Sequence, residues 1–301
     1  QAVFAAALCV ACARIARLSR AGAVLFALLF ATSYPLLSNL KWGQVSVPLT
    51  LCVVGAWGAA RRGRSGVAGA LLGFAAAIKF YPAWFVVYFA LRRDLRACAS
   101  FALTALGCYA AVPMAALGPG AWIAFERSVR DGFAHSRWVM HAENSQYAAH
   151  VVMRWLKLTT GDDHERWLRA LTAASALVAL GCAAMTARLV RRGDDALALV
   201  PLFLALPFLL NTSWPHYLVY LPLCQAVLLA RGATAKPRSL RDRLPPLLAA
   251  LSIALSSVGY FNVFPEWEFY NALGMPFLAN ASLLVAVAMV AATPPREATA
   301  P

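Results

Sequence analysis

The sequence has few charged residues, and no acidic residue lies inside any of its long apolar runs. Only 13% of the 301 residues are charged, whereas 61% are hydrophobic. A soluble domain does not need so much apolar surface, so the composition indicates an all-α polytopic membrane protein. Because the predicted membrane segments lack carboxylates, a proton relay built from buried acids is disfavoured, and a proton-driven transporter with it.

Several motifs of catalysis and cofactor binding are also missing. The sequence contains no Walker loop, no GxSxG motif, no HExxH motif and no nucleotide-sugar domain, so no cofactor is expected. The spacings of His135, His141 and His150 fit no helical ligand pair, so no metal site is predicted. All seven cysteines lie in or beside apolar runs, where they act as small hydrophobic residues and not as a disulfide framework.

The net charge of +14 comes from arginine clusters between the apolar runs. On a soluble protein this charge would suggest nucleic acid, but here it indicates cytoplasmic loops beside anionic lipid and no nucleic-acid partner. A path of about eleven membrane arms puts every tight arginine cluster on one side. This path predicts a single transmembrane domain over residues 1–292, an extracytoplasmic loop at 118–169 and a disordered tail at 293–301. It also places Gln1 outside, so we expect an N-terminal span and a first outer loop to precede it.

The segment Gly66–Arg93 is apolar except for Lys79, which Tyr81 and Pro82 follow closely. As one straight helix it would put arginine clusters on both sides of the membrane, against the positive-inside tendency. As a hairpin broken before Pro82 it has arms of about 20 Å, too short for the hydrocarbon core of about 30 Å. We therefore predict a re-entrant hairpin with Lys79 at its sunken tip, facing a wet cavity or an anionic partner. A lysine that only snorkels to the interface is the alternative.

A second apolar run, at residues 196–230, is interrupted by Asn211–His216. Its tip carries His216, which Trp214 and Tyr217 flank. A lysine and a titratable histidine on two sunken tips suit the phosphate of a lipid-linked donor, since lysine supplies a point charge and histidine a donor of variable charge. The alternative for the two aromatic residues is an interfacial belt.

The long polar stretch at 118–169 contains two notable segments. Residues Trp122–Ala134 are predicted to form a helix that lies on the membrane. Glu143, Asn144 and Gln146 are of the types that contact sugar hydroxyls, although a solvated face would explain their polarity equally well.

Four segments in order carry a family resemblance: Asn39-Leu-Lys-Trp-Gly-Gln44, Ala77-Ile-Lys-Phe-Tyr-Pro82, Glu143-Asn-Ser-Gln146 and Ser213-Trp-Pro-His-Tyr217. The ordered set resembles glycosyltransferase family 87, the polyprenyl-phosphate-mannose-dependent group of C-type membrane glycosyltransferases. The resemblance implies the C-type fold in a bacterial plasma membrane, with the active site facing outside. It implies transfer of a sugar, with mannose expected, from a polyprenyl-phosphate donor to a lipid or glycan acceptor, with inversion.

The resemblance also implies roles for individual residues. Lys79 and His216 would hold the donor phosphate, and Gln44, Asn144 and Gln146 would orient the sugar or carrier. The other expected substrate-binding residues are Tyr81, Glu143 and Trp214. The general base, expected to be an aspartate of the first outer loop, would lie before Gln1, so no catalytic residue is assigned. Where the family often has asparagine after its Gly-Gln pair, this chain has Val45-Ser46.

Two other hypotheses stay open at this point. A transporter or lipid flippase would show internal repeats with matched broken helices, and the two hairpins share only a proline beside an aromatic residue. A catalytically inactive chain would result if the outer loop with the base were missing from the natural protein.

Overall fold

The computed structural model describes residues 1–135, 143–158, 162–234, 239–257 and 267–293. Within these ranges the chain is helical, and its one isolated antiparallel bridge joins Ser33 to Ser257. The predicted all-α class is therefore confirmed. Three helices are long and apolar enough to cross a membrane, namely Leu95–Leu117, Asp163–Arg191 and Met275–Ala292. The other apolar helices of the described residues are shorter, so the count of eleven arms is not confirmed.

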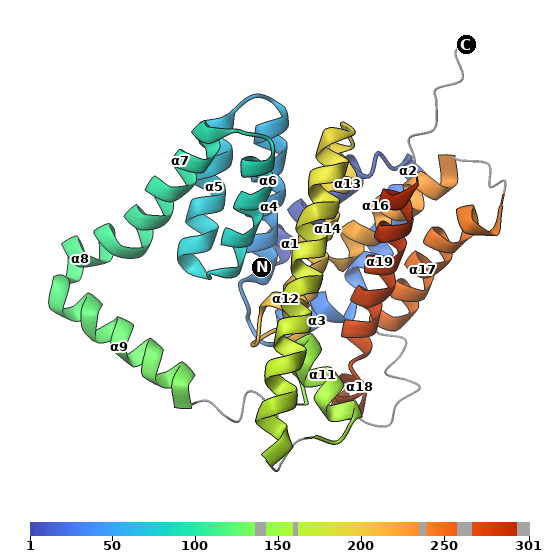
Figure 1. The fold of residues 1–301 in the computed structure, drawn as a ribbon. Helices are drawn as coiled ribbons and strands as arrows, with labels where there is room; N and C mark the ends of the chain where they lie inside the picture. The colour runs from blue at the N-terminus through green and yellow to red at the C-terminus, as the bar shows by residue number, and fades with distance from the viewer. Residues whose placement is uncertain (136–142, 159–161, 235–238, 258–266, 294–301) are drawn as a thin grey trace.

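The helices follow one another along the chain in three groups, which are stretches of sequence and not three separate bodies (Figure 1). The first group is α1 (Ala2–Ile15), α2 (Arg20–Ala31), α3 (Tyr34–Lys41), α4 (Ser46–Arg61), α5 (Ser65–Ile78), the 3-10 turn η1 (Tyr81–Phe85) and α6 (Val86–Leu91). The second group is α7 (Leu95–Leu106), the π-helical turn η2 (Gly107–Ala111), α8 (Val112–Leu117), α9 (Pro119–His135), α11 (Ala148–Trp155) and α12 (Asp162–Arg191). The third group is α13 (Asp195–Ala198), α14 (Val200–Leu204), α15 (Leu206–Leu209), η3 (Pro215–Leu218), α16 (Leu221–Thr234), α17 (Leu240–Ser256), α18 (Trp267–Ala272) and α19 (Met275–Ala292).

The first predicted hairpin is present, and its bend lies at Lys79. Helix α5 ends at Ile78, Lys79 is extended with φ −142° and ψ 138°, and η1 begins at Tyr81 with Pro82 in its first turn. Proline cannot donate a hydrogen bond to the preceding helix and disfavours helical geometry in the residue before it, so the helix stops here. The return arm α6 runs back beside α5 (Figure 1).

An ion-pair network shows that both arginine clusters of this hairpin lie at one end. Arg61 precedes the hairpin and Arg92 follows it, yet both reach the carboxylate of Asp195, at 3.7 Å and 2.7 Å. A straight helix from Gly66 to Leu91 would place these arginines at opposite ends. The alternative of one unbroken membrane helix is therefore excluded.

The second hairpin also returns to the arginine-rich end at which it begins. Its first arm is divided into α13, α14 and α15, because Pro201 and Pro207 interrupt the helical hydrogen bonds. Arg231, at the end of the second arm, pairs with Asp194 at 2.5 Å, just before the first arm begins. Both hairpins thus have their open ends at the arginine-rich end of the molecule, and their bends point away from it.

Helix α5 packs very closely against α7, which fixes the arm that ends at Lys79. A Cβ atom added to Gly69 would lie 2.1 Å from the carbonyl oxygen of Ala97, and one added to Gly73 would lie 2.5 Å from that of Phe101. Small residues allow this approach between membrane helices, where van der Waals packing and interhelical hydrogen bonds drive association. Ser100 Oγ adds such a bond, to the carbonyl oxygen of Gly66 at 2.7 Å.

Two predictions about the chain path need correction. The apolar run Ala21–Ser38, expected from the sequence as one of the membrane arms, is two helices, because α2 ends at Ala31 and α3 begins at Tyr34 with Pro35 in its first turn; the extended Ser33 between them pairs with Ser257. The stretch 118–169 contains α9 and α11, and α12 begins at Asp162, ahead of the apolar arm expected from Ala170; the extracytoplasmic position of the stretch stays a prediction. The polarity of the first turns of α12 marks a helix that extends beyond its apolar part.

Two other predictions for this stretch and the C-terminus have different outcomes. The helix predicted at Trp122–Ala134 is present as α9, while its contact with a membrane stays a prediction. Residues 294–301 of the predicted tail lie outside the described residues.

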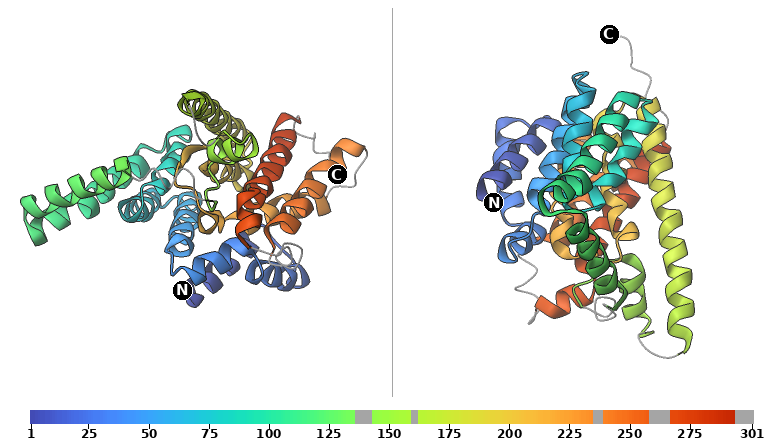
Figure 2. Two further views of the ribbon diagram at one scale, coloured as in Figure 1. Left: turned by 90° about the horizontal axis from the view of Figure 1, so that it is seen from below. Right: turned by 90° about the vertical axis from the view of Figure 1, so that its left-hand side faces the viewer.

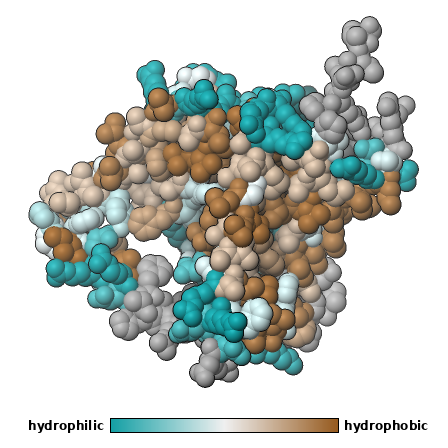
Figure 3. All heavy atoms as spheres, viewed as in Figure 1, coloured by the Kyte–Doolittle hydropathy of each residue, from teal (hydrophilic) through white to brown (hydrophobic). Residues whose placement is uncertain are grey.

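The surface agrees with a membrane-embedded middle region. Figure 3 shows brown, hydrophobic residues between teal caps at the top and bottom. The top cap contains the open ends of the two hairpins, and α11 and α18 lie at the bottom of Figure 1. Figure 2 shows α8 and α9 extending away from the other helices. The bend between α5 and α6 lies between the arginine-rich end and the opposite end, above α11 and α18 (Figure 1).

Candidate functional site

The bends of the two hairpins meet at Lys79. Its Nζ atom donates to Gln44 Oε1 at 3.1 Å and to Tyr217 OH at 3.5 Å. The same ammonium lies 4.7 Å from the centre of the Tyr217 ring, which gives it a cation–π contact. Residues from the turn after α3, from the first bend and from η3 are thus brought together as the sequence predicted.

His216 also contacts the Tyr217 ring. Its ring centre is 4.8 Å from that of Tyr217 and 5.8 Å from that of Trp214. His216 is only 3% exposed, and its Nδ1 atom has no hydrogen-bond partner among the described residues. Since buried polar atoms are nearly always bonded, this nitrogen has capacity for a ligand or a water molecule.

Tyr81 belongs to the same cluster and is buried against Tyr217. Its ring meets that of Tyr217 edge-on, with centres 5.2 Å apart, and the side chain is 7% exposed. Tyr81 therefore helps to hold the Tyr217 ring that the lysine contacts. The structure brings Gln44, Tyr81, Trp214 and His216 into one cluster around Lys79 and Tyr217.

Asn39 supports Gln44, and sequence reasoning gave it no role. The side chain is fully buried and, in the orientation that satisfies its neighbours, donates to the Gln44 carbonyl oxygen at 2.9 Å and accepts from Ser46 N at 3.2 Å. The Gln44 amide nitrogen donates back to the Asn39 carbonyl oxygen at 2.9 Å. These bonds fix the turn from which Gln44 reaches Lys79.

Gln146 holds loops together. It is fully buried, its Nε2 donates to the Asn271 carbonyl oxygen at 3.1 Å, and its Oε1 accepts from Phe277 N at 3.1 Å. Its main-chain nitrogen donates to the Ser213 carbonyl oxygen at 2.6 Å, next to the second bend. A ligand could bond to this amide only by displacing those contacts.

Asn144 and Glu143 are more open than Gln146. Asn144 is partly exposed and its Oδ1 accepts a hydrogen bond from Asn271 Nδ2 at 3.0 Å. Glu143 is exposed and lies near Arg154, whose pKa burial lowers to about 10 while the carboxylate acts in the opposite sense. Arg154 also donates to the carbonyl oxygens of Ser145 and Ala272, at 2.7 Å and 3.1 Å.

The histidines of the polar stretch form no ligand set in the part that can be described. His150 is buried, and its Nδ1 lies 2.8 Å from Ser145 Oγ. His141 lies outside the described residues. Because Ser145 directly follows Asn144, the bond between Ser145 and His150 helps to fix the segment that carries Asn144.

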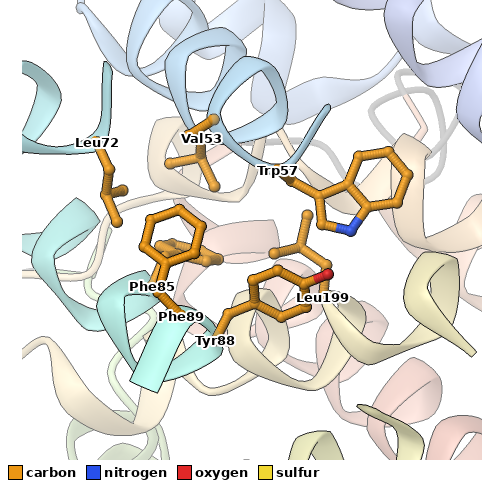
Figure 4. A pocket seen from close by; sticks show the side chains of 8 residues that line it. Val53, Trp57, Leu72, Phe85, Tyr88, Phe89 and Leu199 are labelled. Carbon is orange, nitrogen blue, oxygen red and sulfur yellow. The ribbon is translucent and has the colours of Figure 1, made fainter. Parts of the chain in front are cut away.

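A pocket elsewhere in the molecule does not suit an anionic ligand. Figure 4 shows it lined by Val53, Trp57, Leu72, Phe85, Tyr88, Phe89 and Leu199. Its two polar atoms are already used, because Trp57 Nε1 donates to the Asp195 carbonyl oxygen at 3.0 Å and the Tyr88 hydroxyl bonds the Asp195 carboxylate at 3.3 Å. We therefore place the candidate site at the cluster around Lys79.

Comparison with known proteins gave two matches. The family described as glycosyltransferase family 87 matches residues 1–210. A polyprenol-phosphate-mannose-dependent alpha-(1-2)-phosphatidylinositol mannoside mannosyltransferase of Mycobacterium tuberculosis is 32% identical over 195 residues, which are 62% of this chain and 42% of the relative. The chain thus spans less than half of the length of that relative. No solved structure matches.

Proposed function

Because this chain belongs to glycosyltransferase family 87, we propose that it is a membrane enzyme that transfers a sugar from a polyprenyl phosphate to a lipid or glycan acceptor. Mannose is the first candidate sugar, since the matching relative is named for its dependence on polyprenol-phosphate-mannose. The family match includes Gln44, Lys79 and Asn144, whereas His216 lies beyond it. Support for His216 therefore comes from its place beside Tyr217.

The position of Lys79 is the observation that carries this proposal. Its ammonium is half-buried between Gln44 and Tyr217, and no carboxylate of the described residues pairs with it. A partly buried charge without a counter-charge is costly, so the site suits an anionic ligand. The phosphate of a polyprenyl-phosphate sugar would supply that charge while its chain stays in the lipid.

The proposed reaction is a single displacement at the anomeric carbon. The acceptor hydroxyl oxygen forms the new bond, its proton goes to a general base, and the bond from carbon to the phosphate oxygen breaks. The bonding electrons leave with polyprenyl phosphate, and attack from the opposite face inverts the configuration. Because negative charge grows on the phosphate as this bond breaks, Lys79 stabilises the transition state more than the bound donor.

The remaining site residues are proposed to orient the substrates. Gln44 fixes Lys79, His216 bonds the phosphate, and Trp214 and Tyr81 shape its surroundings. Asn144 and Glu143 lie where they would meet the sugar or the acceptor, and Gln146 acts through the loops that it ties together. No residue is assigned as the general base.

We propose a bacterial plasma membrane with the site outside. The arginine clusters at the open ends of both hairpins favour a cytoplasmic position for that end. The site lies at the hairpin bends, away from these clusters, where a lipid-linked donor could reach it from the outer leaflet.

Transfer of labelled sugar tests this function. Membranes carrying the full-length protein should move label from polyprenyl-phosphate-mannose to an endogenous acceptor, and membranes without it should not. A panel of other polyprenyl-phosphate sugars identifies the donor. Movement of labelled donor between leaflets with no covalent product would instead support a flippase and overturn the proposal.

A further inference from the structure

Asn271, on α18, joins three segments that are far apart in the sequence. The residue is fully buried, and its Nδ2 donates to Tyr34 OH at 2.7 Å and to Asn144 Oδ1 at 3.0 Å. Its carbonyl oxygen accepts from Gln146 Nε2 at 3.1 Å. Asn271 lies beyond the residues 1–210 that the family matches, yet two of its partners belong to the predicted site.

These bonds decide which end of the Asn144 amide is available. Because Asn271 occupies Oδ1, Asn144 keeps Nδ2, which makes no hydrogen bond within the part of the chain that the structure describes. The side chain is partly exposed, so it presents an N–H donor. Turning both amides would bury an unpaired N–H of Asn271, whereas the present arrangement leaves only its Oδ1 unpaired. A buried N–H without a partner is the rarer case.

We propose that Asn271 is a positioning residue that fixes Asn144 as a hydrogen-bond donor to an oxygen of the lipid-linked substrate. That oxygen belongs either to the phosphate or to a sugar hydroxyl. The identity of the ligand rests on the proposed function, whereas the orientation of Asn144 follows from the contacts of Asn271 alone.

A purely structural asparagine provides the matched control. Asn280, on α19, is also fully buried, its Nδ2 donates to the Leu204 carbonyl oxygen at 2.9 Å, and its Oδ1 accepts from Tyr220 OH at 2.8 Å. Neither partner belongs to the predicted site. Replacing either asparagine by alanine removes two side-chain hydrogen bonds from the interior, but only Asn271→Ala releases Asn144.

Binding of polyprenyl phosphate and of polyprenyl-phosphate-mannose to protein in lipid nanodiscs tests the proposal. Asn271→Ala and Asn144→Ala should each weaken binding about tenfold, as for a hydrogen bond to a charged or well-placed acceptor. The double variant should be no weaker than Asn144→Ala, because the two residues act through one bond. Asn280→Ala should bind like the wild type. If the variants lose equal affinity for both ligands, the oxygen that accepts from Asn144 belongs to the phosphate. If they lose affinity only for polyprenyl-phosphate-mannose, it belongs to the sugar.

Several results would overturn this role. These are unchanged affinity in Asn271→Ala, losses that multiply in the double variant, and an equal loss in Asn280→Ala. If Asn271→Ala does not fold, Asn271→Leu keeps the volume without the amide. Asn144→Asp keeps the acceptor for Asn271 but replaces the donor with an anion, and it should also bind more weakly.

The transfer assay separates this inference from the proposed function. Wild-type protein that binds both lipids with the expected pattern of variants but transfers no sugar would overturn the function and leave the role of Asn271 standing. Wild-type protein that binds neither lipid would overturn both.

Discussion

Replacing Lys79 with alanine should lower the rate of sugar transfer by about 100- to 1000-fold. An ammonium about 4 Å from a phosphate charge contributes about 4 kcal/mol at an effective dielectric constant of about 20, which suits a half-buried group. The part of this energy that appears only as charge grows on the leaving phosphate lowers the barrier. A loss of about 2.7–4 kcal/mol corresponds to the stated range. Lys79→Arg should keep part of the rate, because it retains the charge but changes its shape and reach.

The assay is transfer of labelled mannose from polyprenyl-phosphate-mannose, normalised to the amount of folded protein in the membrane. Lys41→Ala is the control, because this lysine is exposed at the end of α3 and its ammonium lies over the Trp42 ring, 5.4 Å from the ring centre. It should transfer at the wild-type rate. A Lys79→Ala protein that keeps more than about a third of the wild-type rate would show that the ammonium does not stabilise the leaving phosphate, and the site would have to be sought elsewhere.

Three further predictions follow from the same contacts. Tyr217→Phe should lower transfer less than about fivefold, since the aromatic ring that contacts the Lys79 ammonium remains. Tyr217→Ala removes that ring and should approach the loss seen in Lys79→Ala. Equal effects of the two substitutions would contradict this prediction. Gly69→Ala should destabilise the detergent-solubilised protein by about 1–3 kcal/mol, seen as a lower Tm, because its Cβ would clash with the main chain of α7. Gly181→Ala, with open space around it, should not lower the Tm. In a background without reactive native cysteines, Arg62→Cys should be labelled only after an impermeant thiol reagent reaches the cytoplasmic side, and Asn211→Cys should be labelled from outside.

The hairpin at Lys79 could be predicted from sequence because two independent patterns require it. Arginines before and after an apolar run cannot both be cytoplasmic if the run is straight, and a proline at Pro82 provides the break. The structure satisfies both through one acid, since Arg61 and Arg92 share Asp195. The meeting of Lys79 with the second bend was also predictable, because both tips were expected at the same depth and on the same side.

The break between α2 and α3 has a weaker signal in the sequence. Residues 21–38 are apolar and long enough for one span, and the local sign of a break is Pro35, which lies in the first turn of α3. The pairing of the preceding Ser33 with Ser257, over two hundred residues away, has no local signal. The start of α12 is hard to place from the sequence for a different reason. Polarity reports exposure to water and not the absence of a helix, so the charged first turns of α12 resemble a loop.

The roles of the amides show where sequence reasoning stops. Gln146 and Asn144 are two residues apart and of similar chemistry, so a motif assigns both to the substrate. The structure separates them by their hydrogen bonds, since both ends of the Gln146 amide are taken by main-chain groups while no described residue bonds the Asn144 amide nitrogen. The contact that distinguishes them is with Asn271, which no spacing connects to either residue. We therefore expect contact with substrate to depend less on the type of residue than on which of its atoms the rest of the fold leaves unbonded.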